Sequence, residues 1–147
     1  MSALAENKRA HFDYEILETY EAGLQLTGAE VKSAKSGHIN LKGSYVTISN
    51  GQATVLNMHI AKYAKAGTQP GYDPYRTRNL LLHKKQIAKL IGKKEEQGVT
   101  LLPLRAYIKN NRVKLAIGLG RGKKKQDKRR SIKEREIKRS IKRSYGV

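Results

Sequence analysis

Apolar and polar residues alternate along the first part of the chain, over the fifteen residues from 12 to 26. The even positions carry most of the aromatic and aliphatic side chains, while the odd positions are mostly polar, with Leu17 as the main exception. Successive side chains of a β-strand point to opposite faces of its sheet. This period of two therefore predicts a strand pair or one long bent strand with one buried face, and Gly23 offers a place for a bend or bulge.

Two short helices are predicted to interrupt the strands. Thr27 and Glu30 have capping-box spacing and Gly37 suits the left-handed position after a helix, so a helix is expected over 27–37. A second helix is expected after the turn-rich segment 64–77, which we interpret as a mobile surface loop. This helix is predicted to begin at His83 or Asn79 and to end at Gly92. Its buried face is predicted to carry Ile87, Leu90 and Ile91.

Two β-hairpins are predicted from alternating segments that flank turn dipeptides. Asn50-Gly51 joins segments 45–49 and 52–60, and this dipeptide tolerates the two positive φ angles of a type I′ turn. Asn110-Asn111 lies inside a second alternating stretch, 100–119, in which the apolar residues share one parity before the turn and the other parity after it. Both stretches are therefore expected to fold back on themselves as antiparallel pairs.

These elements indicate a mainly β fold. About six antiparallel strands with two short helices favour a closed or nearly closed β-barrel, because a small open sheet leaves its edge strands unprotected. Pro103 is expected at a sheet edge or at the start of its strand, since proline has no amide hydrogen for the ladder. With 147 residues, the chain suits one compact domain and an appendage better than two full domains.

Charge divides the chain at Gly120. The sequence has 31 Lys and Arg against 12 Asp and Glu, a net charge of +19, which favours an acidic polymer as partner. Residues 1–120 hold 18 basic and 9 acidic residues, whereas 121–147 hold 13 basic and 3 acidic ones. We therefore predict a folded domain over 1–120 that binds an acidic polymer, for which RNA is our hypothesis, and a basic tail over 121–147. The tail has too few large apolar side chains to offset the entropy of ordering, so it is expected to be disordered when free.

The tail also has features of a helix that forms on contact with a surface. Ser131 and Glu134 have capping-box spacing, and Ile137, Ile141 and Tyr145 recur every four residues. A narrow apolar stripe with a cationic circumference suits an RNA channel better than a membrane surface, where Trp, Phe and Leu anchors are expected. A purely solubilising tail is the alternative, although useful surface charge is normally sparser and of mixed sign.

No pattern in the sequence indicates catalysis, so we expect a protein that is not an enzyme and has no catalytic residue, metal ligand or cofactor. The four histidines lack metal-ligand spacing, and no cysteine is present to form a disulfide or act as a nucleophile. The glycines at 118–122 lack the spacing of a phosphate loop. No signal peptide and no apolar run of about eighteen residues is found, so we expect a cytoplasmic protein that does not enter membranes.

Four blocks of sequence, taken in their order and spacing, resemble the SsrA-binding proteins, the small protein B family of bacterial ribosome rescue. Each block alone is weak, but together they extend from about residue 6 to about residue 140. The blocks are Asn7-Lys8-Arg9-Ala10-His11-Phe12-Asp13-Tyr14; Gly23-Leu24 with Gly28-Ala29-Glu30-Val31-Lys32-Ser33; Asp73-Pro74-Tyr75-Arg76-Thr77-Arg78 with Leu80-Leu81-Leu82; and 120–129 with Ile132-Lys133-Glu134-Arg135-Glu136.

The resemblance implies an oligonucleotide-binding-type β-barrel that holds the tRNA-like domain of transfer-messenger RNA and delivers it to ribosomes stalled without a stop codon. It also implies that the tail becomes helical in the empty messenger channel and contacts small-subunit ribosomal RNA at the decoding centre. Elongation factor Tu, bound to alanine-charged RNA, is a further partner that the resemblance suggests, and a monomer is expected. A ribosomal or general RNA-structuring protein and an RNA-processing enzyme remain as alternatives.

By the resemblance, the contacts to transfer-messenger RNA fall on Asn7, Lys8, Arg9, Glu30, Val31, Lys32, Ser33, Arg121, Lys123 and Lys124. Glu30 has two roles that do not exclude each other: the capping box with Thr27, and a contact to sugar or base donors of the RNA. Arg76 and Arg78 either bind RNA phosphates or hold the preceding loop against the barrel. The run 80–82 is expected in the core rather than at an interface.

In the tail, the stretch matched to the decoding centre is followed by residues of the expected induced helix; in chain order they are Lys125, Gln126, Asp127, Lys128, Arg129, Ile132, Lys133, Arg135, Ile137 and Ile141. Many members of the family have a histidine or an aromatic ring near Gln126, which stacks on a ribosomal base. An amide stacks only weakly, so Lys128 and Arg129 are expected to carry more of this contact.

Overall fold

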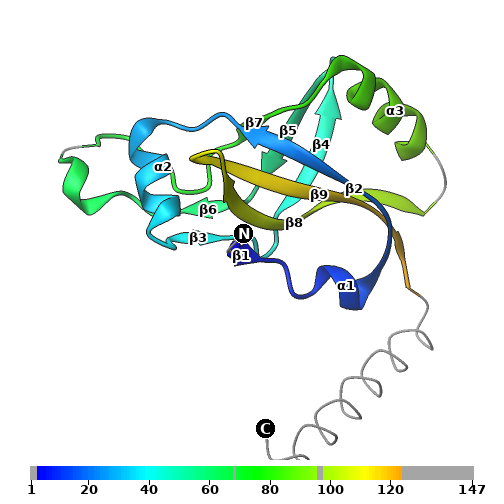
Figure 1. Cartoon of the computed structure of the whole chain (residues 1–147), viewed down its shortest axis with the longest axis horizontal. Coiled ribbons are helices and arrows are strands. Elements are labelled where there is room, and N and C mark those ends of the chain that lie inside the picture. Colours follow the sequence, from blue (N-terminus) through cyan, green and yellow to red (C-terminus); the bar gives the residue numbers. More distant parts are fainter. Residues whose placement is uncertain (1–2, 68, 96–97, 124–147) are drawn as a thin grey trace, which may run out of the picture.

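The computed structural model describes residues 3–67, 69–95 and 98–123 (Figure 1). Of the tail predicted over 121–147, the structure describes only 121–123, of which 121 and 122 belong to a strand; the predictions of free disorder and of an induced helix otherwise concern residues outside these ranges. The same is true of eleven predicted site residues, namely Lys124, Lys125, Gln126, Asp127, Lys128, Arg129, Ile132, Lys133, Arg135, Ile137 and Ile141.

The described residues form nine strands and a few short helices, so the prediction of a mainly β fold is confirmed. In chain order the elements are β1 (Ala3–Glu6), α1 (Ala10–Asp13), β2 (Tyr14–Leu24), α2 (Gly28–Lys35), β3 (Ile39–Asn40), β4 (Tyr45–Ser49), β5 (Gln52–Leu56), β6 (His59–Ile60), the 3-10 turn η1 (Ala64–Ala66), β7 (Arg78–Leu81), α3 (Lys84–Lys94), β8 (Val99–Lys109) and β9 (Arg112–Gly122).

Seven of these strands form one sheet, in the order β1-β8-β9-β2-β7-β5-β4, and β3 pairs with β6 in a separate ribbon. Neighbouring strands are antiparallel, as predicted, although the main sheet has seven strands where about six were expected. The sheet twists around the core, so that β4 at one end of the order lies near β8 (Figure 1). Helix α2 lies at one end of the molecule and α3 at the other (Figure 1).

Both predicted hairpins are confirmed. Asn50 and Gly51 have φ angles of 52° and 74° between β4 and β5, and Asn110 and Asn111 have φ angles of 52° and 61° between β8 and β9. The second arm of the first hairpin is shorter than predicted, because Asn57 has a φ of 58° and interrupts it. The chain beyond Asn57 pairs as β6 with β3 instead.

Strand β2 is one long strand, as one of the two predicted alternatives required. It begins at Tyr14, because Phe12 belongs to the short helix α1. The pairing of β2 with β9 shifts register between Ile16 and Glu18, so the irregularity lies at this point rather than at the expected Gly23. A one-residue shift moves side chains to the other face of a sheet. Tyr20 therefore packs on the main core, whereas Ile16 packs on a second, smaller cluster.

Strand β8 has a matching shift between Pro103 and Arg105. Leu101 belongs to the main core, while Leu102 and Leu104 join Ala10 of α1 in the smaller cluster. Pro103 is not at the start of β8, which begins at Val99, but β1 pairs with β8 only over 105–107, so at Pro103 the strand has a ladder partner on the β9 side alone. The proline also lies at the bulge, a position where a sheet tolerates it. The two bulges allow one sheet to bury apolar side chains on both of its faces.

Two glycines of β9 make room for the smaller cluster. A Cβ atom on Gly118 would lie 3.0 Å from Leu104 Cδ1, and one on Gly120 would lie 3.1 Å from Tyr14 Cβ. These distances leave little space for a side chain in a packed interior. Gly118 and Gly120 thus allow Leu104 of β8 and Tyr14 at the start of β2 to pack closely on β9, which explains these two glycines without a phosphate loop.

Both predicted helices are present. Helix α2 has the predicted capping box, and Gly37 follows it with a φ of 86°. Helix α3 follows His83, which was one of the two predicted starts, and its Leu90 is buried. The stripe and the end of α3 were partly wrong, because Ile91 is 40% exposed and the helix continues past Gly92 to Lys94. Within the described residues, no helix combines the length and apolar character needed to span a bilayer.

Candidate nucleic-acid interface

Glu30 lies in a buried cluster that joins α2 to the loop before β7. Its side chain is only 1% exposed. Its Oε1 accepts a hydrogen bond of 3.0 Å from the backbone amide of Thr27, and the Glu30 amide donates to Thr27 Oγ1 at 3.2 Å. Arg76 donates from Nε to Glu30 Oε2 at 3.0 Å and also pairs with Oε1. The capping role of Glu30 is confirmed, and the same carboxylate also holds an arginine from a distant segment.

Arg78 completes this cluster with an entirely buried guanidinium, at 0% exposure. Its Nε donates to Glu30 Oε2 at 2.7 Å, and the other nitrogens donate to the backbone carbonyl oxygens of Met58 and Pro74 at 2.6 and 3.0 Å. Every buried side-chain nitrogen and oxygen of the described residues has a hydrogen-bond partner. Arg78 therefore holds the loop in place, one of its two predicted roles, and its guanidinium faces the protein rather than the solvent.

The ionisation of Glu30 reflects these contacts. Burial by itself would raise the pKa of the carboxyl group, but hydrogen bonds from Arg76, from the Thr27 backbone and from Arg78 outweigh it and hold the pKa at about 2. The ordinary value is 4.5. The contacts in this cluster therefore stabilise the charged form of the Glu30 carboxylate. Because these contacts exist only in the folded protein, the charged carboxylate also stabilises the fold.

This lowered pKa predicts a specific acid sensitivity. A group whose pKa is lower in the folded state stabilises the fold fully above its unfolded pKa and loses that contribution as the pH falls. The contribution of Glu30 is therefore expected to be complete above pH 4.5 and to disappear as the pH approaches about 2. Urea unfolding of the wild type and of Glu30→Gln across this window measures it. The difference in stability between the two proteins should shrink with acid, and a constant difference would contradict the assignment.

The other predicted residues of α2 divide between interior and surface. Ser33 is buried and donates from Oγ to the Ala61 carbonyl oxygen at 2.6 Å, so it also fixes the start of the loop. Val31 is half-buried against the main core. Lys32 alone of the run 30–33 is exposed and is available for contact with a phosphate.

A basic surface lies at the other end of the molecule, where the first predicted block meets the end of β9. Asn7 is held in place, because its amide donates to the Leu104 carbonyl oxygen at 2.8 Å and its side chain donates to that of Pro103 at 2.9 Å. Lys8 and Arg9 are exposed. The Arg9 guanidinium lies 4.7 Å from the centre of the Phe12 ring, which restricts its orientation.

The end of β9 runs beside this block. Strand β9 continues to Gly122, two residues beyond the charge boundary that we placed at Gly120, and Gly122 pairs with Tyr14. The Lys123 amide donates to the Asp13 carbonyl oxygen at 2.9 Å, and Lys123 Nζ donates to that of His11 at 2.8 Å. The structure therefore brings together two sets of predicted cations that are more than a hundred residues apart in the sequence, namely Lys8, Arg9, Arg121 and Lys123.

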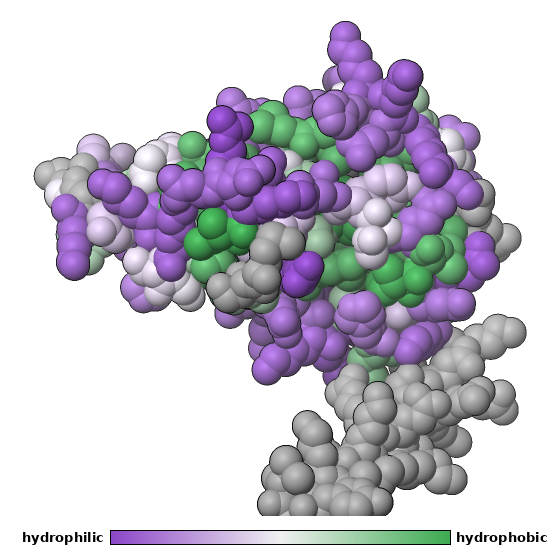
Figure 2. Space-filling view, viewed as in Figure 1, coloured by the Kyte–Doolittle hydropathy of each residue, from purple (hydrophilic) through white to green (hydrophobic). Residues whose placement is uncertain are grey.

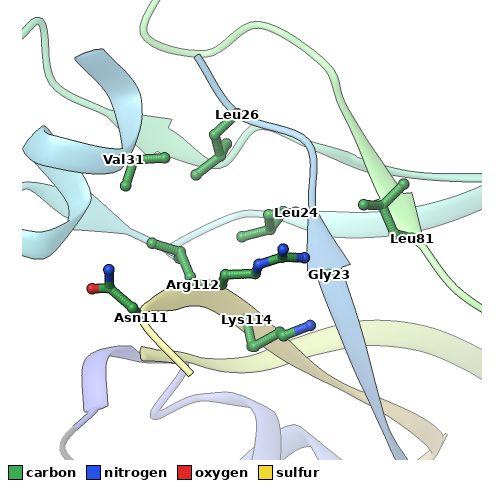
Figure 3. Close-up of a pocket in the computed structure, with 9 residues that line it drawn as sticks. Gly23, Leu24, Leu26, Val31, Leu81, Asn111, Arg112 and Lys114 are labelled. Atoms are coloured by element: carbon green, nitrogen blue, oxygen red, sulfur yellow. The ribbon is translucent and has the colours of Figure 1, made fainter. Parts of the chain in front are cut away.

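A further candidate site, which we call the Leu81 groove, was not predicted. Leu81 of β7 is 58% exposed and faces a recess lined by the apolar side chains of Leu24, Leu26 and Val31 (Figure 3). Basic residues of β9 lie along the same recess. A second recess shares four of these lining residues and extends toward α3, so the two form one groove; the shared residues are Gly23, Leu81, Arg112 and Lys114.

The Leu81 groove combines two features that RNA recognition uses. Its floor offers apolar side chains to the faces of bases or riboses, and its β9 side offers cations to phosphates. On the face shown in Figure 2, hydrophilic side chains surround smaller hydrophobic patches. In the Leu81 groove, the exposed side chain of Leu81 lies along the same recess as the cations of β9.

The β8–β9 hairpin connects the groove to the basic surface. Arg112 lines the groove at the start of β9, and Arg121 belongs to the basic surface at its end. At about 3.4 Å per residue, a strand of this length separates the two points by roughly 30 Å. A long paired strand is stiff, so the two sites are held at a fixed spacing on one platform.

Comparison with known proteins agrees on one family. The SmpB protein family model matches residues 4–146. The SsrA-binding protein of Thermosynechococcus vestitus is 49% identical over 144 residues, 98% of this chain and 95% of that protein, and the one of Anoxybacillus flavithermus is 51% identical over 142 residues, 97% and 92%. A solved structure described as "tmRNA-SmpB: a journey to the center of the bacterial ribosome" matches with a TM-score of 0.67 and 47% identity, over 82% of this chain and 84% of that one. The chain belongs to the SmpB family.

Membership of the SmpB family confirms the resemblance found in the four sequence blocks. The structure shows that these blocks differ in their structural roles. In the block from Asp73 to Arg78, the two arginines contact Glu30 inside the protein, so this part of the SmpB resemblance reflects how the loop is held. The block from Asn7 to Arg9 exposes its two cations.

The Leu81 groove was missed because the alternation of buried and exposed residues along β7 was not recognised in the sequence. We expected the run of leucines at 80–82 in the core, and Leu80 and Leu82 do contact it. Burial alternates along β7, however, with Arg78 and Leu80 buried and Asn79 and Leu81 exposed. Because this alternation begins with a buried arginine, it lacks the apolar residue that usually indicates the buried face of a strand, and β7 of this SmpB-family chain was not predicted.

No group of three or more potential metal ligands gathers within the ranges described for the chain.

Proposed function

We propose that this chain is an RNA-binding adaptor of trans-translation, which binds the tRNA-like domain of transfer-messenger RNA and delivers it to stalled ribosomes in the cytoplasm. The observation that carries the proposal is the SmpB family match over residues 4–146, which includes both the β domain and the tail. Relatives named SsrA-binding proteins and a solved structure described with tmRNA and the ribosome support it. The chain acts by binding, without a catalytic step, cofactor or metal.

The proposed architecture is an oligonucleotide-binding-type barrel that extends the predicted domain 1–120 to the end of β9 at Gly122, closed by the approach of β4 to β8 and followed by a tail that is disordered until it meets the ribosome. The charge of 121–147, with 13 basic and 3 acidic residues, suits a segment that orders on RNA. In this proposal the tail enters the empty messenger channel, and residues 125–129 reach small-subunit ribosomal RNA at the decoding centre. Elongation factor Tu accompanies the charged RNA.

The proposed RNA contacts follow from exposure. Cations with exposed or half-exposed side chains bind phosphates, and they are Lys8, Arg9, Lys32, Arg112, Lys114, Arg121 and Lys123, with Lys124 beyond the described residues. Glu30, Ser33 and Arg78 are buried, so their proposed role is to position α2 and the loop rather than to touch RNA. Asn7, Val31 and Arg76 support the same surfaces from half-buried positions.

Removing residues 124–147 tests the two parts of this function. The deletion leaves β9 and both hydrogen bonds of Lys123 in place, so the domain should still fold and still bind a tRNA-like RNA, with lower affinity because cations are lost. Peptide tagging on stalled ribosomes should disappear, since no tail remains to enter the channel. Both are measured in a reconstituted translation reaction with a message that lacks a stop codon.

Normal tagging by the truncated chain would contradict the adaptor model. Stoichiometric sedimentation of the full chain with all ribosomes, stalled or not, would instead favour a constitutive ribosomal protein. A tail of the same composition in scrambled order serves as the control, because it keeps the charge and loses the spacing. If the scrambled tail restores tagging, charge alone accounts for the role of the tail.

A further inference from the structure

Tyr75 has an aromatic ring that is exposed on the surface. It belongs to the loop between β6 and β7, beside α2 (Figure 1). The side chain is 55% exposed. Neither the Leu81 groove nor the basic surface includes Tyr75, so the proposed function gives this ring no role.

The ring is held in a fixed orientation. The rings of His59 and Tyr75 meet edge to face, with centroids 4.8 Å apart and planes at 61°. The Tyr75 amide donates to Asp73 Oδ1 at 2.9 Å, which fixes the backbone in a turn. An exposed side chain that is already immobilised loses little conformational entropy on binding.

The loop beneath the ring is anchored on both sides of it. The carbonyl oxygen of Pro74, one residue before, accepts hydrogen bonds of 3.0 Å from the Ile60 amide and from the Arg78 guanidinium. Arg76, one residue after, is bound to the buried carboxylate of Glu30. Tyr75 is thus an exposed ring on a rigid base, although we predicted a mobile loop from its turn residues.

A polar recess is lined by the two residues that follow Tyr75 in the chain, Arg76 and Thr77. It has a volume of about 380 Å³, and most of its lining side chains donate or accept hydrogen bonds: Gln25, Thr27, Arg76, Thr77 and Asn79, with Leu26 as the apolar exception. Exposure alternates from Tyr75 through Thr77 to Asn79, with the two arginines between them turned toward Glu30. The exposed ring and the hydrogen-bonding recess are therefore successive positions of one segment.

The loop that carries the ring is basic, which favours an anion as ligand. Lys62 and Lys65 are exposed in the same loop, Arg76 is partly exposed, and Asp73 is the one acidic residue between 61 and 77. The carboxylate of Asp73 already accepts the Tyr75 amide. A nucleotide has a flat apolar face, a hydrogen-bonding edge and a phosphate, and these match the ring, the recess and the lysines respectively.

We infer that Tyr75 stacks an unpaired nucleobase, whose edge enters the recess lined by Gln25, Thr77 and Asn79 while the adjoining phosphates meet Lys62 and Lys65. A protein partner fits less well, because a single exposed ring with polar surroundings lacks the apolar core of a protein interface. This inference rests on the proposed function in that the chain must bind RNA, and it adds an unpaired nucleotide as a separate contact.

The test uses the full chain and a single-stranded RNA of about ten nucleotides that carries one 2-aminopurine, whose fluorescence is quenched by stacking. The wild type should quench the probe, and Tyr75→Ala should remove the quenching and weaken binding by roughly tenfold. Tyr75→Phe keeps the ring and the packing against His59, so it should retain both effects. Ile91→Ala removes a comparably exposed apolar side chain on α3 and should change neither.

The outcomes separate this inference from the proposed function. Unchanged quenching and affinity in Tyr75→Ala, or no quenching by the wild type, would overturn the stacking role. Equal loss in Tyr75→Ala and Tyr75→Phe would also overturn it, because the ring would then not be the cause. Binding of a tRNA-like RNA by the wild type is measured in parallel, and its absence would refute the proposed function itself, whatever the short probe shows.

Discussion

Replacing Arg78 with methionine is expected to lower the free energy of unfolding by about 3 to 5 kcal/mol. The substitution keeps much of the side-chain volume but removes the guanidinium that hydrogen-bonds Glu30 and two backbone carbonyl oxygens. These acceptors lie inside the protein, where water does not replace a lost donor. Glu30 then remains almost completely buried with a single arginine partner.

Chemical denaturation measures this change, and two further substitutions give it a scale. Arg76→Met removes the partly exposed partner of the same carboxylate and should cost less, since water reaches that side of the cluster. Lys32→Met removes an exposed cation from α2 and should change stability by no more than about 0.5 kcal/mol. If Arg78→Met costs no more than Lys32→Met, the cluster does not stabilise the fold in the way its contacts suggest.

Local chemistry explains which elements could be predicted from the sequence. Asn50-Gly51 and Asn110-Asn111 form turns because these residues tolerate positive φ, a property of the residues themselves. The capping box of Thr27 and Glu30 joins residues three apart, and it formed as predicted. The bulges near Leu17 and Pro103 depend on how two strands pair across the sheet, so no single stretch of sequence contains them.

The candidate site was predicted only in part for a related reason. Composition identified an acidic polymer as the partner, and the cations of the first block and of β9 are exposed as expected. For Glu30 and Arg78 the sequence left an RNA contact and a structural role both open, because charged side chains are rarely buried unless they are paired. Their pairing joins residues 48 apart, so it became visible only in the fold. Leu81 has the opposite character, an apolar residue that the strand turns outward.

Neutralising Arg112 and Lys114 together is expected to weaken binding of a tRNA-like RNA by about a hundredfold at moderate salt, if each cation meets one phosphate and contributes roughly tenfold. In Arg112→Gln with Lys114→Gln, both side chains remain polar and long, so the hairpin should keep its fold. The salt dependence should change as well. Each neutralised duplex phosphate contributes about 0.9 to the log-log slope, so the slope should fall by nearly two.

A matched pair of substitutions on α3 distinguishes specific RNA binding in the groove from general electrostatic attraction between the protein and RNA. Lys84→Gln with Lys94→Gln removes the same net charge from exposed positions that do not line the groove. Long-range attraction falls equally in both double variants, whereas direct phosphate contact is lost only in the first. Across a salt series, the log-log slope should therefore fall by nearly two for the groove pair and change much less for the α3 pair, and at moderate salt the groove pair should bind more weakly than the α3 pair. Equal losses at every salt concentration would show that net charge, and not the position of Arg112 and Lys114 beside Leu81, determines the affinity.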